Sequence, residues 1–148
     1  MGSLDTVLGK NSQAQVKLSS AEAFVAITLA ATSLDGYLSE EEARCISSVL
    51  SRLKLFRNYT NEPMNSLFEK ILGMLRRDDI NILFDTAKES LTPDLREAAF
   101  AVATDLLLSE GIPTEEETNF LYDLHQALSI SRDVAIQIVQ VIVIKNRA

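Results

Sequence analysis

Apolar residues recur along most of the chain at intervals of three and four, which places them on one side of an α-helix. The series Ala43, Ile46, Val49, Leu50 and Leu53 is the clearest example. Such series follow residues that cap or open helices, namely Ser39, Pro63, Asp78 or Asp79, Thr114 and Ser131. The pattern predicts an all-α fold of about seven helices. The helix that begins at Ser39 or Glu40 is expected to end between residues 58 and 61.

Two segments are apolar nearly all round, which predicts helices buried at the centre of the fold. The first covers residues 23–34 and follows a capping box formed by Ser19 and Glu22. The second covers residues 95–108 and follows the cap and first-turn proline of Thr92 and Pro93. We expect the second helix to be the counterpart of the first.

The last segment, residues 134–144, is rich in β-branched residues and alone is typical of a strand. Helix is the better interpretation because no other segment offers a partner strand. Its apolar run is far shorter than the roughly 20 residues that span a bilayer, and Gln137 and Gln140 interrupt it. The segment is expected to be a core helix or a homodimer face rather than a membrane span.

The chain contains an internal repeat with a spacing of 75 residues, measured from Gly36 to Gly111. Residues 34–42 and 109–117 each contain an acidic residue, a glycine, a short turn, a helix cap and three glutamates. The apolar residues before each turn match at the same offset, so that Ala23 aligns with Ala98. The repeat predicts a duplicated helix-turn-helix unit with pseudo-twofold symmetry around the two central helices.

Helix capping explains every residue of the repeated turn. Ser39 with Glu42, and Thr114 with Glu117, each fit the reciprocal capping box. The three glutamates that begin each helix also lie where the helix dipole favours negative charge. No metal ion is required by this interpretation.

A calcium loop offers a second interpretation of the same turns. With Gly36 at the invariant glycine of an EF-hand loop, Asp35, Ser39 and Glu42 occupy the fifth, ninth and twelfth positions, which are oxygen-donor positions. The first and third donor positions fall on apolar or hydroxyl residues in both copies, so neither turn alone should hold Ca²⁺ strongly. If the two units pack together, four carboxylates could converge on one divalent cation such as Ca²⁺, Mg²⁺, Mn²⁺ or Zn²⁺: Asp35, Glu42, Glu110 and Glu117.

Length and charge narrow the possible functions. The 148 residues suit one domain, with residues 1–18 a weakly ordered N-terminal arm and residues 19–148 the helical body. A net charge of −7 and scattered basic residues argue against a nucleic-acid partner. No secretion signal opens the chain and the single Cys45 cannot form an internal disulfide, which together favour the cytoplasm.

No motif supports an enzyme, because the chain lacks a phosphate loop, a dinucleotide fingerprint and a nucleophile elbow. His125, the only histidine, has no ligand-spaced partner and is expected to be half-exposed on a helix. Cys45 is expected to be a small buried residue. Asp105 could approach the acidic turns or accept a structural hydrogen bond.

The repeated turns resemble those of the TerB-like tellurite-resistance family. The resemblance covers most of residues 21–144 and rests on the alanine-rich first central helix and on Asp35, Gly36, Ser39, Glu42, Gly111, Thr114 and Glu117. It implies an all-α fold with internal pseudo-symmetry, a role in bacterial stress or tellurite resistance, and a divalent metal at the acidic turns. Glu110 departs from the family, whose turn usually has aspartate there.

Similar domains precede J-domains in membrane co-chaperones, and this chain resembles a stand-alone version that reaches a membrane only through partners. Two hypotheses follow. The first is a non-enzymatic TerB-like protein that binds a divalent cation through its paired turns. The second is an interaction module, in which the turns are only caps and an apolar helix face recruits a protein partner or a second copy.

Overall fold

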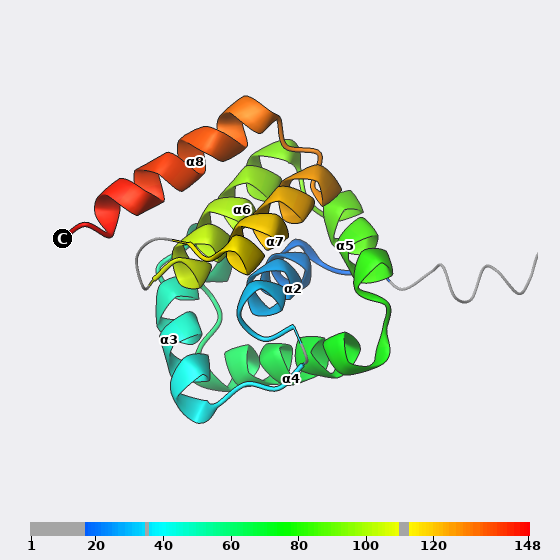
Figure 1. The fold of residues 1–148 in the computed structure, drawn as a ribbon. Helices are drawn as coiled ribbons and strands as arrows, with labels where there is room; N and C mark the ends of the chain where they lie inside the picture. Colours follow the sequence, from blue (N-terminus) through cyan, green and yellow to red (C-terminus); the bar gives the residue numbers. More distant parts are fainter. Residues whose placement is uncertain (1–16, 35, 110–112) are drawn as a thin grey trace, which may run out of the picture.

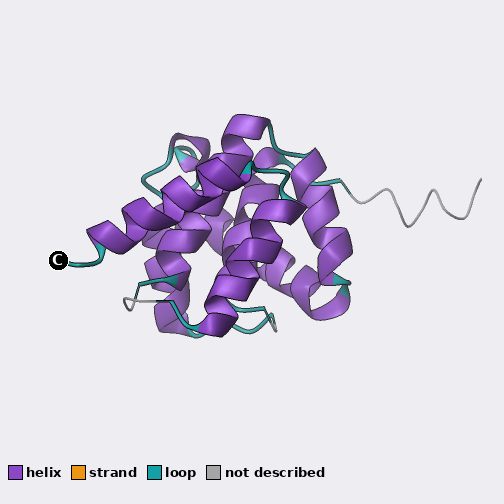
Figure 2. Cartoon of the chain, turned by 45° about the horizontal axis from the view of Figure 1, so that its top comes forward, coloured by secondary structure: helices purple, strands orange, loops and turns teal. Residues whose placement is uncertain are grey.

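The computed structural model describes residues 17–34, 36–109 and 113–148. Within these ranges the chain forms seven α-helices and no strand, which confirms the predicted all-α fold (Figures 1 and 2). The helices are α2 (Ser20–Thr32), α3 (Glu40–Leu50), α4 (Asn61–Arg77), α5 (Ile80–Glu89), α6 (Pro93–Leu107), α7 (Glu115–Ala127) and α8 (Arg132–Lys145), and the short 3₁₀ helix η1 (Lys54–Phe56) lies between α3 and α4.

The helix starts follow the capping residues that the sequence predicts. In six helices a side-chain oxygen of the N-cap residue accepts a hydrogen bond from a backbone N–H of the first turn. These N-cap residues are Ser19, Ser39, Asp79, Thr92, Thr114 and Ser131. Caps are local interactions, which explains why residue type alone identifies them.

The central helix is α2, whose residues from 23 to 30 are all at most 1% exposed. It packs most extensively on α6 and also contacts α4 and α5. Alanines at Ala23, Ala26 and Ala30 bring these neighbours close, because small side chains keep the helix axes near to one another. Phe24 extends the core to Phe56, with ring centroids 5.8 Å apart.

The order α2, α3, α4 recurs as α6, α7, α8, with α5 between the two units (Figure 1). The N-caps Ser39 and Thr114 lie 75 residues apart, as the repeat predicts. Contacts recur as well, since α2 packs on α4 and α6 packs on α8. The second unit is less enclosed, because only Ala99, Phe100, Ala103 and Thr104 are buried within α6.

The helix after the first turn is shorter than expected. It ends at Leu50 rather than between residues 58 and 61, and η1 follows. Ser48 and Ser51, which are weak helix formers, lie at this point, and the Ser51 hydroxyl donates to the Ser48 carbonyl oxygen at 2.9 Å. The turn allows Phe56 to enter the core, where it is 1% exposed.

The last segment is helical, and its expected burial in the core is only partial. Ala135 is the only buried residue of α8, whereas Ile136, Val141 and Ile144 are 42%, 61% and 56% exposed. The helix packs on α6 along one side and extends along the edge of the bundle (Figure 1). Within the described ranges, no helix combines the length and the apolar character needed to cross a membrane.

Candidate functional site

Both capping boxes predicted at the repeated turns are present. The Ser39 backbone N–H donates to Glu42 Oε1 at 2.9 Å, and the Glu42 N–H donates to Ser39 Oγ at 3.0 Å. Thr114 and Glu117 form the same pair of hydrogen bonds at 3.0 and 3.1 Å. Each glutamate thus uses one carboxylate oxygen to satisfy a helix start.

The structure describes only half of the predicted cation ligands. Asp35 and Glu110 lie outside the described residues. Glu42 is exposed at the start of α3, and Glu117 is half-buried at the start of α7. Among the residues that are described, no group of three or more His, Cys, Asp or Glu side chains could hold a metal ion.

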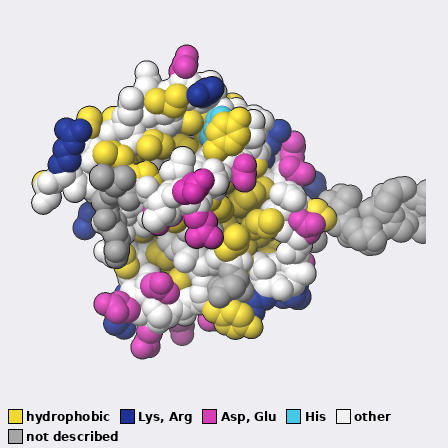
Figure 3. All heavy atoms as spheres, in the orientation of Figure 1, with side chains coloured by type: hydrophobic (Ala, Val, Ile, Leu, Met, Phe, Trp, Pro, Cys, Tyr) yellow, Lys and Arg dark blue, Asp and Glu magenta, His cyan; other side chains and the backbone are white. Residues whose placement is uncertain are grey.

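The two helix starts occupy different parts of the surface. In Figure 3, acidic side chains gather over the start of α3 at the lower left and, separately, over α7 near the centre. The helices α3 and α7 are also not among the pairs that pack closely. Convergence of the two turns on one cation stays a prediction, because it also depends on Asp35 and Glu110.

The C-terminal end of the third helix of each unit is hydrogen-bonded to the repeated turn in the first unit and to the residue before the turn in the second. In the first unit, Arg76 at the end of α4 donates from Nη1 to the Gly36 carbonyl oxygen at 2.7 Å. In the second, Asn146 at the end of α8 donates from Nδ2 to the Leu108 carbonyl oxygen, also at 2.7 Å. The first turn therefore has a guanidinium beside it, whereas the corresponding tie in the second unit is uncharged.

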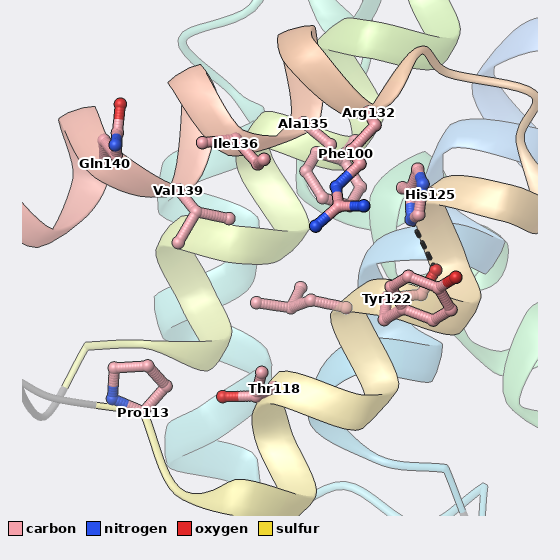
Figure 4. A pocket seen from close by; sticks show the side chains of 11 residues that line it. Phe100, Pro113, Thr118, Tyr122, His125, Arg132, Ala135, Ile136, Val139 and Gln140 are labelled. Atoms are coloured by element: carbon pink, nitrogen blue, oxygen red, sulfur yellow. Dashed lines mark hydrogen bonds between the residues drawn. The ribbon is translucent and has the colours of Figure 1, made fainter.

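A hollow of about 250 Å³ opens between α7 and α8, with α6 as its floor (Figure 4). We call it the α7–α8 groove and define it by Phe100 on α6, Leu121 and Tyr122 on α7, and Arg132, Ile136 and Val139 on α8. Most of these side chains are apolar. Pro113 and Thr118 lie at one end of the groove, and His125 lies at the other (Figure 4).

His125 differs from its expected half-exposed position, since it is only 8% exposed. Its Nδ1 donates a hydrogen bond to the Tyr122 carbonyl oxygen, and its ring packs edge-on against the Tyr122 ring at a centroid distance of 5.0 Å. The histidine thus supports the position of Tyr122, whose own side chain is 52% exposed beside the groove.

Two other candidate residues have structural explanations. Cys45 is exposed, which corrects the expectation of a buried thiol; its place on the outer side of α3 follows from the burial of Ile46 and Leu50. Asp105 forms an ion pair with Lys145, with Oδ1 and Nζ 3.2 Å apart. That pair joins α6 to the C-terminal end of α8 rather than to either acidic turn.

The sequence interpretation missed the α7–α8 groove. The available signal was that apolar residues in 134–144 surround α8 on more than one side, whereas a helix at the edge of a bundle is covered on only one. Which side is covered depends on tertiary packing. Periodicity alone therefore could not locate the groove.

Comparisons with known proteins add no assignment. No protein-family model matches the chain, and neither the curated proteins nor the solved structures include a match to it. The TerB-like resemblance therefore still rests on the residues of the two turns.

Proposed function

We propose that the protein is a non-enzymatic interaction module that binds another protein through the α7–α8 groove. The observation that carries this proposal is the uncovered apolar side of α8 next to a preformed hollow. Of the seven large hydrophobic residues that are exposed in the described part of the chain, four lie on these two helices: Tyr122, Ile136, Val141 and Ile144. Single exposed hydrophobic residues are ordinary, but a group of them beside a hollow is typical of a protein-binding surface.

The size of the groove favours inserted side chains over a small-molecule ligand. Its volume of about 250 Å³ is below the range of roughly 300–1,000 Å³ that is usual for ligand pockets. Such a hollow holds a few apolar side chains of a partner that continues across the surface outside it.

Quantitative capture of partners from the native cells tests this proposal. Tagged wild-type protein is compared with a groove variant, Tyr122→Ser with Ile136→Ser, and with a control variant, Leu34→Ser with Ile82→Ser, whose residues lie outside α7 and α8. All four side chains are at least 42% exposed, so we expect both variants to fold. A stoichiometric partner that is kept by the control, lost by the groove variant and retained in EDTA supports the proposal. A partner retained equally by both variants, or none at all, contradicts it.

A second candidate function is divalent-cation binding, as the TerB-like resemblance implies. The observation that favours it is the matching placement of Glu42 and Glu117, each held by a capping box through Oε1. Within the described residues, Oε2 of each carboxylate forms no hydrogen bond and is available to a cation. In this proposal Asp35 and Glu110 complete the ligand set. Calorimetric titration of the wild type and of Glu42→Gln with Glu117→Gln with divalent cations tests this proposal.

A further inference from the structure

Basic residues lie at both ends of α8, with apolar residues between them. Arg132 begins the helix, Ile136 and Val139 follow on the same side, and Arg147 lies exposed just beyond the last turn. Figure 4 shows the Arg132 side chain pointing from α8 into the space between α7 and α8. Figure 3 shows apolar surface over α8 with basic side chains at either end.

These two arginines have no acidic partner within the described part of the chain. Lys145 differs, because it pairs with Asp105. Arg132 and Arg147 are 15 positions apart, which corresponds to about 22 Å, or four turns, along a helix axis. The helix α8 therefore presents apolar residues between two arginines that are about four turns apart, and the groove lies at the Arg132 end.

A second copy of this chain fits this surface of α8 poorly. If two α8 helices packed antiparallel about their middles, Arg132 of one copy would lie beside Lys145 and Arg147 of the other. If they packed in parallel, the two Arg132 side chains would meet. Both arrangements bring like charges together at an apolar contact, which opposes association.

A membrane surface also fits poorly. The groove is concave, so a lipid surface across it would leave the hollow of about 250 Å³ unfilled. The net charge of −7 opposes approach to an anionic bilayer. A helix laid in a groove fills such a hollow with side chains at positions i, i+3, i+4 and i+7.

The opposite side of the groove limits where a partner can carry acidic residues. The first turn of α7 contains Glu115, Glu116 and Glu117, which would repel a uniformly acidic segment. A partner helix must therefore present its carboxylates toward α8 and its neutral or basic residues toward the start of α7.

We propose that the partner is an amphipathic α-helix of about four turns, with an apolar face in the groove and acidic residues near both ends that pair with Arg132 and Arg147. This rests on the interaction function proposed above and specifies the class of partner. The apolar side chains provide affinity, and the two charge pairs fix the register of the helix along α8.

The test uses two synthetic helical peptides as probes, with the same leucines at helical spacing. One has glutamate near both ends on the side that faces α8, and the other has lysine at those positions. Binding of each labelled peptide to the full chain is measured by fluorescence anisotropy at low salt. We expect the acidic peptide to bind about tenfold more tightly, since two ion pairs replace two repulsive contacts.

Charge-reversal variants then show which residues of the protein cause the preference for the acidic peptide. Arg132→Glu with Arg147→Glu should reverse the preference, so that the lysine peptide binds more tightly. Arg52→Glu with Arg57→Glu is the matched control, because it makes the same charge change at exposed residues outside the groove and should leave the preference intact.

The outcomes separate this inference from the proposed function. If neither peptide binds, or binding is unchanged in the Tyr122→Ser with Ile136→Ser variant, the groove function itself is overturned. If binding depends on those two residues but shows no charge preference, only the acidic-helix partner is overturned. It is also overturned if anionic vesicles of phosphatidylserine capture the protein through Arg132 and Arg147, or if the wild type dimerises through α8 in sedimentation.

Discussion

The Arg76 guanidinium donates to the Gly36 carbonyl oxygen at 2.7 Å, and it also lies 5.0 Å from the centre of the Tyr37 ring. Gly36 has a φ of +84°, in the left-handed region that glycine adopts without a steric penalty. A Cβ added there would meet Arg76 Cγ and, at 3.0 Å, the Leu72 carbonyl oxygen. The first repeated turn thus needs glycine both for its backbone angle and for its contact with α4.

We expect Gly36→Ala to lower the free energy of unfolding by about 1–2 kcal/mol from the left-handed backbone alone, with a further loss from the contact with α4. Gly73→Ala is the control, since Gly73 lies inside α4 and an added Cβ meets only the flexible end of Arg77, at 3.1 Å. That change should stabilise the protein by up to about 1 kcal/mol. Urea unfolding followed by circular dichroism measures both, and equal effects of the two substitutions would contradict this account.

The capping glutamates allow the cation hypothesis to be tested without losing the fold. Glutamine keeps the side-chain oxygen that a capping box needs, so Glu42→Gln with Glu117→Gln should change the free energy of unfolding by less than about 1 kcal/mol. The variant removes two of the four proposed carboxylate ligands. If a cation binds, calorimetric titration with Ca²⁺, Mg²⁺, Mn²⁺ and Zn²⁺ should show binding to the wild type that the variant loses.

Variants that lower stability without removing a carboxylate provide the control for that titration. Ser39→Ala and Thr114→Ala should each lower the free energy of unfolding by about 1 kcal/mol, because each removes a capping oxygen but no carboxylate. Wild-type binding weaker than millimolar for all four ions would end the cation hypothesis. So would unchanged binding after Asp35→Ala with Glu110→Ala.

The ion pair between Glu22 and Lys70 predicts a pH-dependent contribution to stability. The hydrogen bond from Lys70 Nζ, at 2.7 Å, lowers the pKa of Glu22 below its ordinary value of 4.5, with partial burial opposing it and the Ser19 contacts adding to it. A carboxyl group with a lowered pKa in the folded state stabilises that state above the unfolded pKa, and the contribution is lost as pH falls through the folded pKa.

Lys70→Met should therefore lower the free energy of unfolding at neutral pH, and the difference from wild type should shrink as pH falls below about 4.5. An NMR titration should also show that the pKa of Glu22 rises toward its ordinary value. Lys54→Met, at an exposed lysine without an ion pair in the described structure, should leave that pKa unchanged. A difference that stays constant from neutral to acid pH would argue against this assignment.

The two halves of the repeat should respond differently to the same substitution. Ala23 and Ala98 align at the 75-residue spacing, but Ala23 is 0% exposed in α2 whereas Ala98 is exposed on α6. Ala23→Leu inserts three carbon atoms into a packed core and should lower the free energy of unfolding by about 1–3 kcal/mol. Ala98→Leu should change it by less than about 0.5 kcal/mol. Thermal unfolding monitored by calorimetry compares them, and matching losses would mean that both positions are enclosed.

Features that depend on near neighbours in the chain were predictable from the sequence. The capping residues Ser39 and Thr114 identify helix starts because each bonds to a backbone group three residues away. The enclosed α2 was predictable because a helix apolar on all sides is stable only when every side is covered. The capping roles of Glu42 and Glu117 followed from the same short-range chemistry.

Features that depend on which elements meet were not predictable. His125 is buried because Tyr122 and the neighbouring helices cover it. The periodicity of the sequence does not show which residues cover this side chain. The apolar residues of α8 predict a helix correctly, but they do not show that only α6 packs closely against it. The groove arises from that incomplete cover, so tertiary structure was needed to find it.

The limited burial of α8 also determines which part of the molecule unfolds first. Ala135 is buried near the start of α8. The C-terminal end of the helix is held by the ion pair between Lys145 and Asp105 and by the hydrogen bond from Asn146 to the Leu108 carbonyl oxygen. A helix with only one fully buried residue is expected to detach in a subglobal step, at a lower free energy than unfolding of the whole chain. Amide hydrogens of α8 should therefore exchange with deuterium well before those of α2. A bound partner would delay exchange in α8 while the rate in α2 stays the same.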